Sequence, residues 1–131
     1  MSPLDPRERD LVKCEDMRIH AERARKFMGT RSLEEFLSDE MLQAAVIRCV
    51  EVVGEAARQV SEDTRRRATG IPWAQIVGMR NILAHDYGAV DLERVYSVVM
   101  EEMRELLEHI NKLILSLEQE VGWQEGDDND E

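Results

Sequence analysis

The chain has 131 residues, enough for one domain with a buried core and too few for two. Its composition of 43% hydrophobic, 34% charged and 5% aromatic residues is typical of a helical protein. No apolar run approaches the roughly 20 residues of a membrane span, and the first residues lack the apolar core of a signal peptide, so we expect a cytoplasmic protein. The net charge of −11 argues against a general nucleic-acid binder, because nonspecific affinity for phosphate backbones comes mostly from Lys and Arg.

The N-terminal third of the chain predicts one long helix followed by a short one. Asp5-Pro6 opens the long helix and Gly29 ends it, since proline suits the first helical position and glycine the position after the last. Ser32 can then cap a short helix from Leu33 to Leu37. Apolar residues follow the long helix at spacings of three and four, which indicates lengthwise packing against other helices: Cys14, Met17, Ala21, Ala24 and Met28.

The next helix, which either Ser38 or Asp39 can cap, is expected from Asp39 to about Val60, and it is apolar almost all round. Such a helix is buried on several sides. Its polar exceptions fall on one stripe: Arg48, Glu51, Glu55 and Arg58. This stripe is either a row of intrahelical ion pairs at the surface or the neighbour of a functional site. In the second case a carboxylate from Glu51 or Glu55 would orient a catalytic group.

A polar cluster ends the helix that follows. Ser61 opens a short helix through Arg67, and Pro72-Trp73 opens the longer helix that stops before Gly88. At about 100° per residue, Arg80 and Tyr87 share one stripe of this helix, and Asn81 and His85 share the neighbouring stripe. A guanidinium, an imidazole, an amide and a phenol on one side suit phosphate binding and proton transfer better than packing.

The C-terminal segment predicts a long helix and then a tail. Asp91 caps the helix, and apolar residues keep the three-and-four spacing to Leu117: Leu92, Val95, Val99, Met103, Leu106, Ile110 and Leu113. The last residues carry many carboxylates, so we divide the chain into a helical domain over residues 1–122 and an acidic disordered tail over residues 123–131.

These helices predict an all-α fold, an antiparallel up-and-down bundle of four to five helices. The helix from Asp39 has more apolar surface than one small bundle covers, so we expect a homodimer. Cys14 and Cys49 are expected to be small buried hydrophobic residues. No His, Cys, Asp or Glu residues have the spacing of a metal site, and no phosphate-binding or Rossmann glycine pattern is present, so we expect neither a metal nor another cofactor.

The spacing of three polar residues resembles the Rx4HxY motif of HEPN domains, specifically the HepT-like branch. Four residues separate Arg80 from His85, and one residue separates His85 from Tyr87. The polar Asn81, the Pro-Trp helix start and the upstream Glu51 to Ala56 segment agree with the resemblance, which extends to about Leu117. It implies a ribonuclease with its site in a dimer cleft, Arg80 and His85 as catalytic residues and Asn81 in a supporting role.

The HepT-like resemblance also implies regulation. In that branch, a partner antitoxin with a minimal nucleotidyltransferase (MNT) domain transfers AMP to the tyrosine of the motif, which here is Tyr87. The chain would then be the toxin of a type VII-like toxin–antitoxin pair that cuts RNA without a metal. The competing hypothesis is a catalytically silent helical dimer that binds a partner protein or a nucleotide, with Arg80 and His85 as a structural polar cluster.

Overall fold

The first three helices begin at the residues predicted to cap them. The computed structural model describes residues 5–85 and 90–129; for residues 80–82, 84–85 and 123–129 it describes the helical backbone alone. The helices are α1 (Pro6–Met28), α2 (Leu33–Leu37) and α3 (Glu40–Gln59). The side chains of Asp5, Ser32 and Asp39 accept hydrogen bonds from backbone N–H groups in the first turns. Gly29 follows α1 with a φ of 56°, a left-handed conformation that glycine adopts without strain.

The second half of the chain contains helices α4 (Glu62–Arg66), α5 (Trp73–His85), α6 (Leu92–Met100) and α7 (Glu102–Asn129). Ser61 caps α4 and Asp91 caps α6, both as predicted. The single long helix expected after Asp91 is instead divided at Glu101.

The division between α6 and α7 has a cause in α1. The Arg25 guanidinium donates hydrogen bonds to the carbonyl oxygens of Val99, at 2.8 Å, and Met100, at 3.4 Å. In a continuous helix these carbonyls accept from backbone N–H groups four residues later. A side chain inserted into the helical hydrogen-bond ladder is a recognised cause of a helix break. Spacing alone could not reveal it, because the donor lies about 75 residues away in the sequence.

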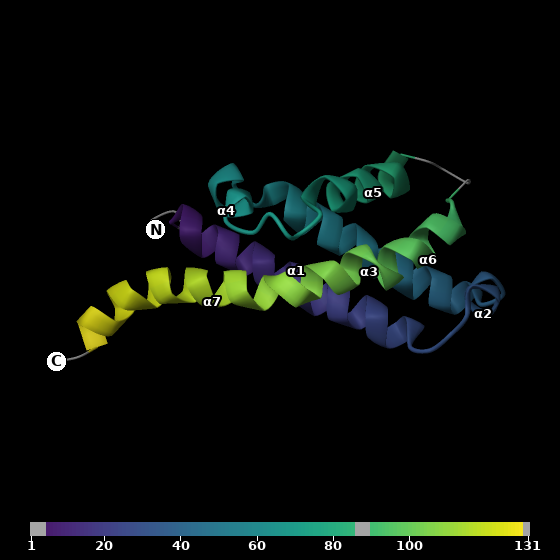
Figure 1. Cartoon of the computed structure of the whole chain (residues 1–131), viewed down its shortest axis with the longest axis horizontal. Helices are drawn as coiled ribbons and strands as arrows, with labels where there is room; N and C mark the ends of the chain where they lie inside the picture. The colour runs from purple at the N-terminus through teal and green to yellow at the C-terminus, as the bar shows by residue number, and fades with distance from the viewer. Residues whose placement is uncertain (1–4, 86–89, 130–131) are drawn as a thin grey trace.

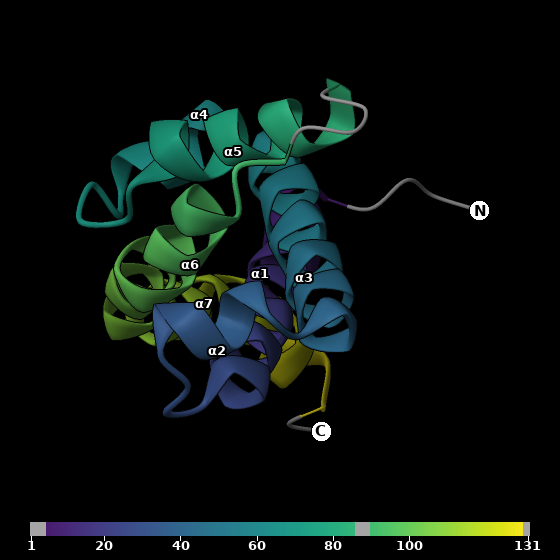
Figure 2. The ribbon, with the colours of Figure 1, turned by 90° about the vertical axis from the view of Figure 1, so that its right-hand side faces the viewer.

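The helices pack side by side, with α1 between α7 and α3, and α3 between α1 and α5 (Figures 1 and 2). Helices α1 and α5 run in one direction, and α3 and the α6–α7 pair run in the other (Figure 1). The short helix α2 lies at one end of the bundle, where it contacts α3 and α6 (Figure 2). The prediction of an all-α antiparallel bundle is confirmed.

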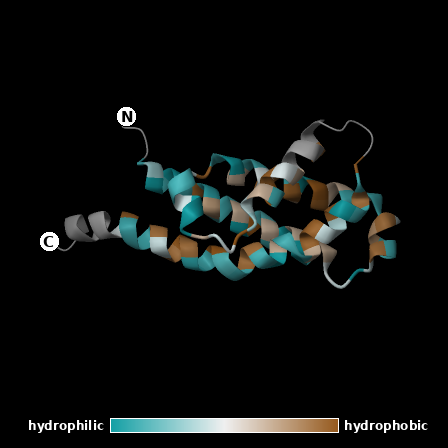
Figure 3. Ribbon diagram, turned by 45° about the horizontal axis from the view of Figure 1, so that its top comes forward, coloured by the Kyte–Doolittle hydropathy of each residue, from teal (hydrophilic) through white to brown (hydrophobic). Residues whose placement is uncertain are grey.

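Every long helix contributes its apolar stripe to one continuous core, and polar residues alternate with apolar ones along the ribbons (Figure 3). Cys14 and Cys49 are both buried in this core as free thiols, as predicted. Most apolar residues of α3 are buried within the single chain, although Met41 stays 85% exposed. The apolar surface of α3 is therefore a weaker argument for a dimer than the sequence indicated.

Helix α7 continues through Asn129, past the proposed boundary at residue 122. That boundary stays a prediction. None of the described helices is both long enough and apolar enough to cross a membrane.

Candidate active site

Helix α5, which carries the motif, is fixed at its start by Trp73. The carbonyl of Pro72 accepts the backbone N–H of Ile76 at 3.1 Å, the first helical hydrogen bond. The indole Nε1 of Trp73 donates to the carbonyl of Ala68 at 3.0 Å, and the Arg65 guanidinium lies 5.8 Å from the ring centroid. The Trp73 ring is thus held by a hydrogen bond and a cation–π contact.

Buried side chains hold the rest of α5 against α3. Ile76 and Met79 are almost completely buried in the core, and Leu83 packs against it. The spacing of three and four between these residues defines the face of α5 that points inward. Because Met79 directly precedes the motif, the backbone that carries the motif is anchored one residue away.

The predicted site residues Arg80, Asn81 and His85 all belong to the last two turns of α5, where the sequence placed them. Their side chains, and Tyr87 as a whole, lie outside the described residues. The predicted grouping of the four side chains on one side of the helix therefore stays a prediction. What the structure adds is that the helix carrying these residues packs on α3.

The polar stripe of α3 contains intrahelical ion pairs, which was the simpler of the two interpretations. Arg48 lies 3.5 Å from Glu51, and Arg58 lies 2.7 Å from Glu55. Gln59 also donates to the Glu55 carboxylate at 3.0 Å. The hydrogen bond that Arg58 donates to the Glu55 carboxylate raises the pKa of the Arg58 guanidinium above its ordinary value. Whether Glu51 or Glu55 also orients a residue of the motif stays a prediction.

Glu51 and Glu55 additionally line a groove of about 220 Å³ between α1 and α3, opposite Lys13 and Asp16 of α1. Both signs of charge are therefore present in it. Elsewhere, no three His, Cys, Asp or Glu side chains of the described residues lie close enough together to hold a metal ion.

The family model for HepT-like ribonucleases matches residues 17–113, which include all of α5 and the motif. That span is most of the chain. The chain belongs to the HepT-like ribonuclease family. Family membership supports ribonuclease activity, and it agrees with the helical fold.

Two relatives illustrate the similarity to this HepT-like chain. A protein of Thermococcus cleftensis named as a probable ribonuclease HepT is 34% identical over 99 residues, which cover 76% of this chain and 90% of the relative. A protein of Methanocaldococcus jannaschii named as a "putative RNase" is 37% identical over 93 residues, 71% of this chain and 80% of the relative. No solved structure gives a significant match.

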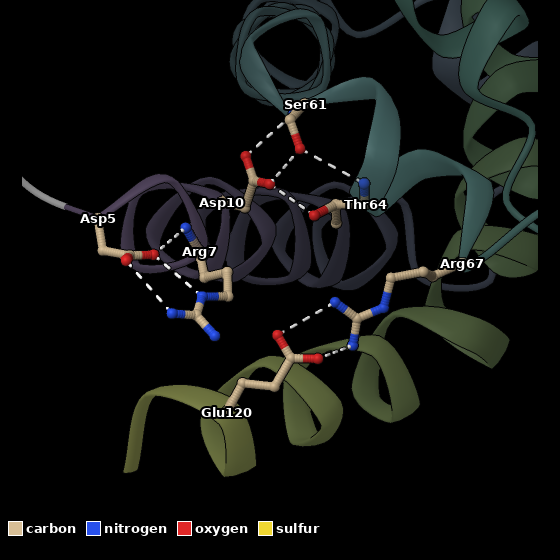
Figure 4. Close-up of polar contacts among 7 residues, drawn as sticks. All are labelled: Asp5, Arg7, Asp10, Ser61, Thr64, Arg67 and Glu120. Carbon is tan, nitrogen blue, oxygen red and sulfur yellow. Dashed lines mark hydrogen bonds and ion pairs between the residues drawn. The ribbon is translucent and has the colours of Figure 1, made fainter. Parts of the chain in front are cut away.

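Two of the arginines after Ser61 make specific contacts with other helices. Arg65 donates to the carbonyls of Ala57 and Arg58 at the end of α3. Arg67 pairs with Glu120 at 2.6 Å (Figure 4). It also donates a hydrogen bond to the hydroxyl of Ser116. These arginines tie α4 and the loop after it to α3 and α7.

A pocket of about 320 Å³ lies between this loop and α7, and the sequence analysis gave its residues no role. His109 and Lys112 line it from α7, where they are three residues apart and so share a face. The spacing of His109 and Lys112 can be recognised in the sequence. The sequence does not show that the loop lies opposite them, because the loop and this part of α7 are about 40 residues apart.

Proposed function

We propose that the chain is the toxin of a type VII-like toxin–antitoxin pair, a metal-independent endoribonuclease that acts as a homodimer. The observation that carries the proposal is the family match, since it spans the segment of the chain in which Arg80, His85 and Tyr87 follow one another at the motif spacing. The relatives' names support RNA as the substrate class.

The proposed reaction is an in-line attack by the substrate's own 2′-hydroxyl. A base takes the 2′-hydroxyl proton as the 2′-oxygen bonds to phosphorus, the bond from phosphorus to the 5′-oxygen breaks, and an acid protonates the leaving oxygen. The products are a 2′,3′-cyclic phosphate and a 5′-hydroxyl. No activated water is consumed, so a metal-bound hydroxide has no part in the step.

Arg80 and His85 have the chemistry that this reaction needs. The Arg80 guanidinium would stabilise negative charge on the phosphorus oxygens, and the His85 imidazole would transfer protons. One imidazole cannot easily act at both ends of an in-line displacement. A cleft between two protomers supplies two copies of each residue, so the proposed site is composite. Asn81 would position the substrate, and Glu55 of α3 would act as a positioning residue for the motif.

Regulation would act through Tyr87. A partner MNT-type nucleotidyltransferase would transfer AMP from ATP to the Tyr87 oxygen, with pyrophosphate as the leaving group. The added phosphodiester would carry negative charge on the stripe of Arg80 and compete with the RNA phosphate.

The test combines cleavage with growth. The purified protein should cut single-stranded RNA in excess EDTA and leave 2′,3′-cyclic phosphate ends. Arg80→Ala and His85→Ala should each abolish cleavage and relieve the growth defect caused by expressing the chain alone in a bacterial host. Arg104→Ala is the matched control, because Arg104 is exposed and pairs only with Glu108 among the described residues. A requirement for Mg²⁺ would refute the mechanism, cleavage by both motif variants would place the activity outside the motif, and a native protein that neither cuts RNA nor harms growth would favour the silent dimer.

A further inference from the structure

The pocket between the loop after α4 and α7, here called the α4–α7 pocket, gathers basic and hydroxyl groups on an acidic protein. It is lined from the loop by Arg67, Thr69 and Gly70, and from α7 by His109, Lys112 and Ser116. None of its described lining residues is a carboxylate. Its volume of about 320 Å³ is at the lower end of the range for small-ligand sites.

The cations of the pocket differ in how they are compensated. Arg67 is neutralised by Glu120 (Figure 4) and also donates a hydrogen bond to the hydroxyl of Ser116. Lys112 and His109 have no hydrogen-bond or ion-pair partner among the described residues. In a chain with a net charge of −11, an uncompensated ammonium in a concave site is an uncommon feature that favours a bound anion.

The backbone of the loop lets His109 approach closely. A Cβ atom added to Gly70 would lie 2.8 Å from Nε2 of His109, closer than such atoms come in practice. The glycine therefore allows the imidazole to lie directly against the loop and form one wall of the pocket.

A second groove adjoins the pocket and leads toward α5. The two share Thr69 and Gly70, and the second groove follows the chain from Arg65 through Pro72 to Gln75 in the first turn of α5. Two adjoining grooves of this kind suit an extended phosphate-bearing chain better than a single small molecule. Glu62 and Glu105 line the second groove, so the most favourable place for a phosphate is the α4–α7 pocket itself.

We propose that the α4–α7 pocket binds a backbone phosphate of the RNA substrate, away from the reaction centre. This rests on the proposed ribonuclease function. The loop that lines the pocket leads into the start of α5, and the motif lies at the other end of that helix. At 1.5 Å per residue, about 10 Å of helix separates Trp73 from Arg80 and about 18 Å separates it from His85. Lys112 supplies the charge, and His109, Thr69 and the loop backbone supply hydrogen-bond donors.

The main test measures RNA binding in the full chain carrying His85→Ala, so that the RNA stays intact. Adding Lys112→Ala should weaken binding of a single-stranded RNA of about 20 nucleotides roughly two- to fivefold. It should also reduce the slope of log affinity against log salt by about 0.7, the value of one released counterion. Lys26→Ala removes the same charge from an exposed position on α1 and should leave the slope unchanged. Equal effects of the two lysine variants would overturn the proposal.

Two further measurements separate geometry from charge. Gly70→Ala changes no charge but displaces the His109 ring, so it should weaken RNA binding with an unchanged salt slope. In otherwise native protein, Lys112→Ala should raise KM for the long RNA, whereas a dinucleotide substrate, too short to reach the pocket, should be cut as before. An equal effect on both substrates would contradict a separate phosphate site.

A titration with inorganic phosphate tests the pocket without any ribonuclease activity. The His109 ring resonances should shift in the native protein, and the shift should be smaller in Lys112→Ala. If phosphate moves these resonances but the chain neither binds nor cuts RNA, the proposed function fails and the assignment to RNA falls with it. If the chain cuts RNA but phosphate leaves His109 unmoved, only the pocket proposal fails.

Discussion

The carboxylate of Asp10 in α1 accepts both the backbone N–H and the hydroxyl of Ser61, the residue that caps α4 (Figure 4). The same carboxylate accepts the hydroxyl of Thr64, one turn into α4. Asp10 is only 4% exposed, so three hydrogen bonds replace the water that burial removes. This contact fixes the start of α4 on α1, and with it the loop that leads to the motif helix.

Asp10→Ala is expected to lower the free energy of unfolding by about 3 kcal/mol, because it leaves a buried N–H and two hydroxyls without their charged acceptor. Asp10→Asn keeps the shape and should cost less. Urea denaturation followed by circular dichroism measures both. Glu118→Ala, an exposed carboxylate on α7, should change stability by less than about 0.5 kcal/mol. An Asp10→Ala protein as stable as this control would show that the contact contributes little.

The sequence predicted most of the fold because its helices are bounded by local signals. Asp5, Ser32, Asp39, Ser61 and Asp91 each accept the first-turn hydrogen bonds that their residue types suggested. Contacts between distant segments were not predictable in this way. The insertion of Arg25 at Val99 and the role of Asp10 both depend on which helices become neighbours, and no local spacing encodes that.

The candidate site was predicted to the level of its supporting helix. The motif spacing placed Arg80 and His85 on α5, and the structure shows why α5 is held firmly, through Trp73 and Met79. The polar stripe on α3 had two interpretations: it does contain the ion pair of Glu55 with Arg58, and whether Glu55 also orients a residue of the motif stays a prediction. A helical stripe shows which side chains share a face, but not which neighbouring helix that face meets.

We expect the buried thiol of Cys14 to make the free energy of unfolding depend on pH in the alkaline range. Burial, assisted by the charges of Asp10 and Glu15, raises the pKa of its thiol from 9.0 to about 12. The folded state therefore disfavours the thiolate. This contribution to stability is fully present below about pH 9 and is lost as the pH rises toward 12.

The Cys14 contribution can be isolated by comparison with Cys14→Ala, in which the same position cannot ionise. The difference in free energy of unfolding between native and variant protein should be constant from pH 7 to 8.5 and should shrink above pH 9. Thiol-specific reagents should also label Cys14 only under unfolding conditions. Parallel stability curves over the whole pH range would contradict this account.

The composite site predicts a stable dimer. Light scattering at micromolar concentration should give about twice the 15.1 kDa chain mass. Because Val12 on α1 is 47% exposed and the α1–α3 groove lies on the same pair of helices, Val12→Glu tests one interface for that dimer. Met41→Glu makes the same change at the exposed start of α3. A native protein that is monomeric and still cuts RNA would rule out a site composed of residues from two protomers.

The last prediction concerns Tyr87, which follows the end of α5 at His85 by two residues. A modifying enzyme needs access to the phenol oxygen, and inhibition needs the attached phosphodiester to reach Arg80. A position just beyond the end of the helix, seven residues after the arginine, is suited to both. AMP on this oxygen would act as a tethered competitor of the RNA phosphate, effective at a high local concentration without a change of fold.

Tyr87→Phe should therefore keep the fold and much of the ribonuclease activity, yet escape neutralisation by the partner nucleotidyltransferase and ATP. Tyr96→Phe is the matched control, since the Tyr96 hydroxyl donates to the carbonyl of Arg31 and lies in α6. Mass spectrometry of the coexpressed pair should find the AMP adduct on the peptide that contains Tyr87; an adduct on the Tyr96 peptide, or complete silencing of the Tyr87→Phe protein, would show that regulation uses another residue.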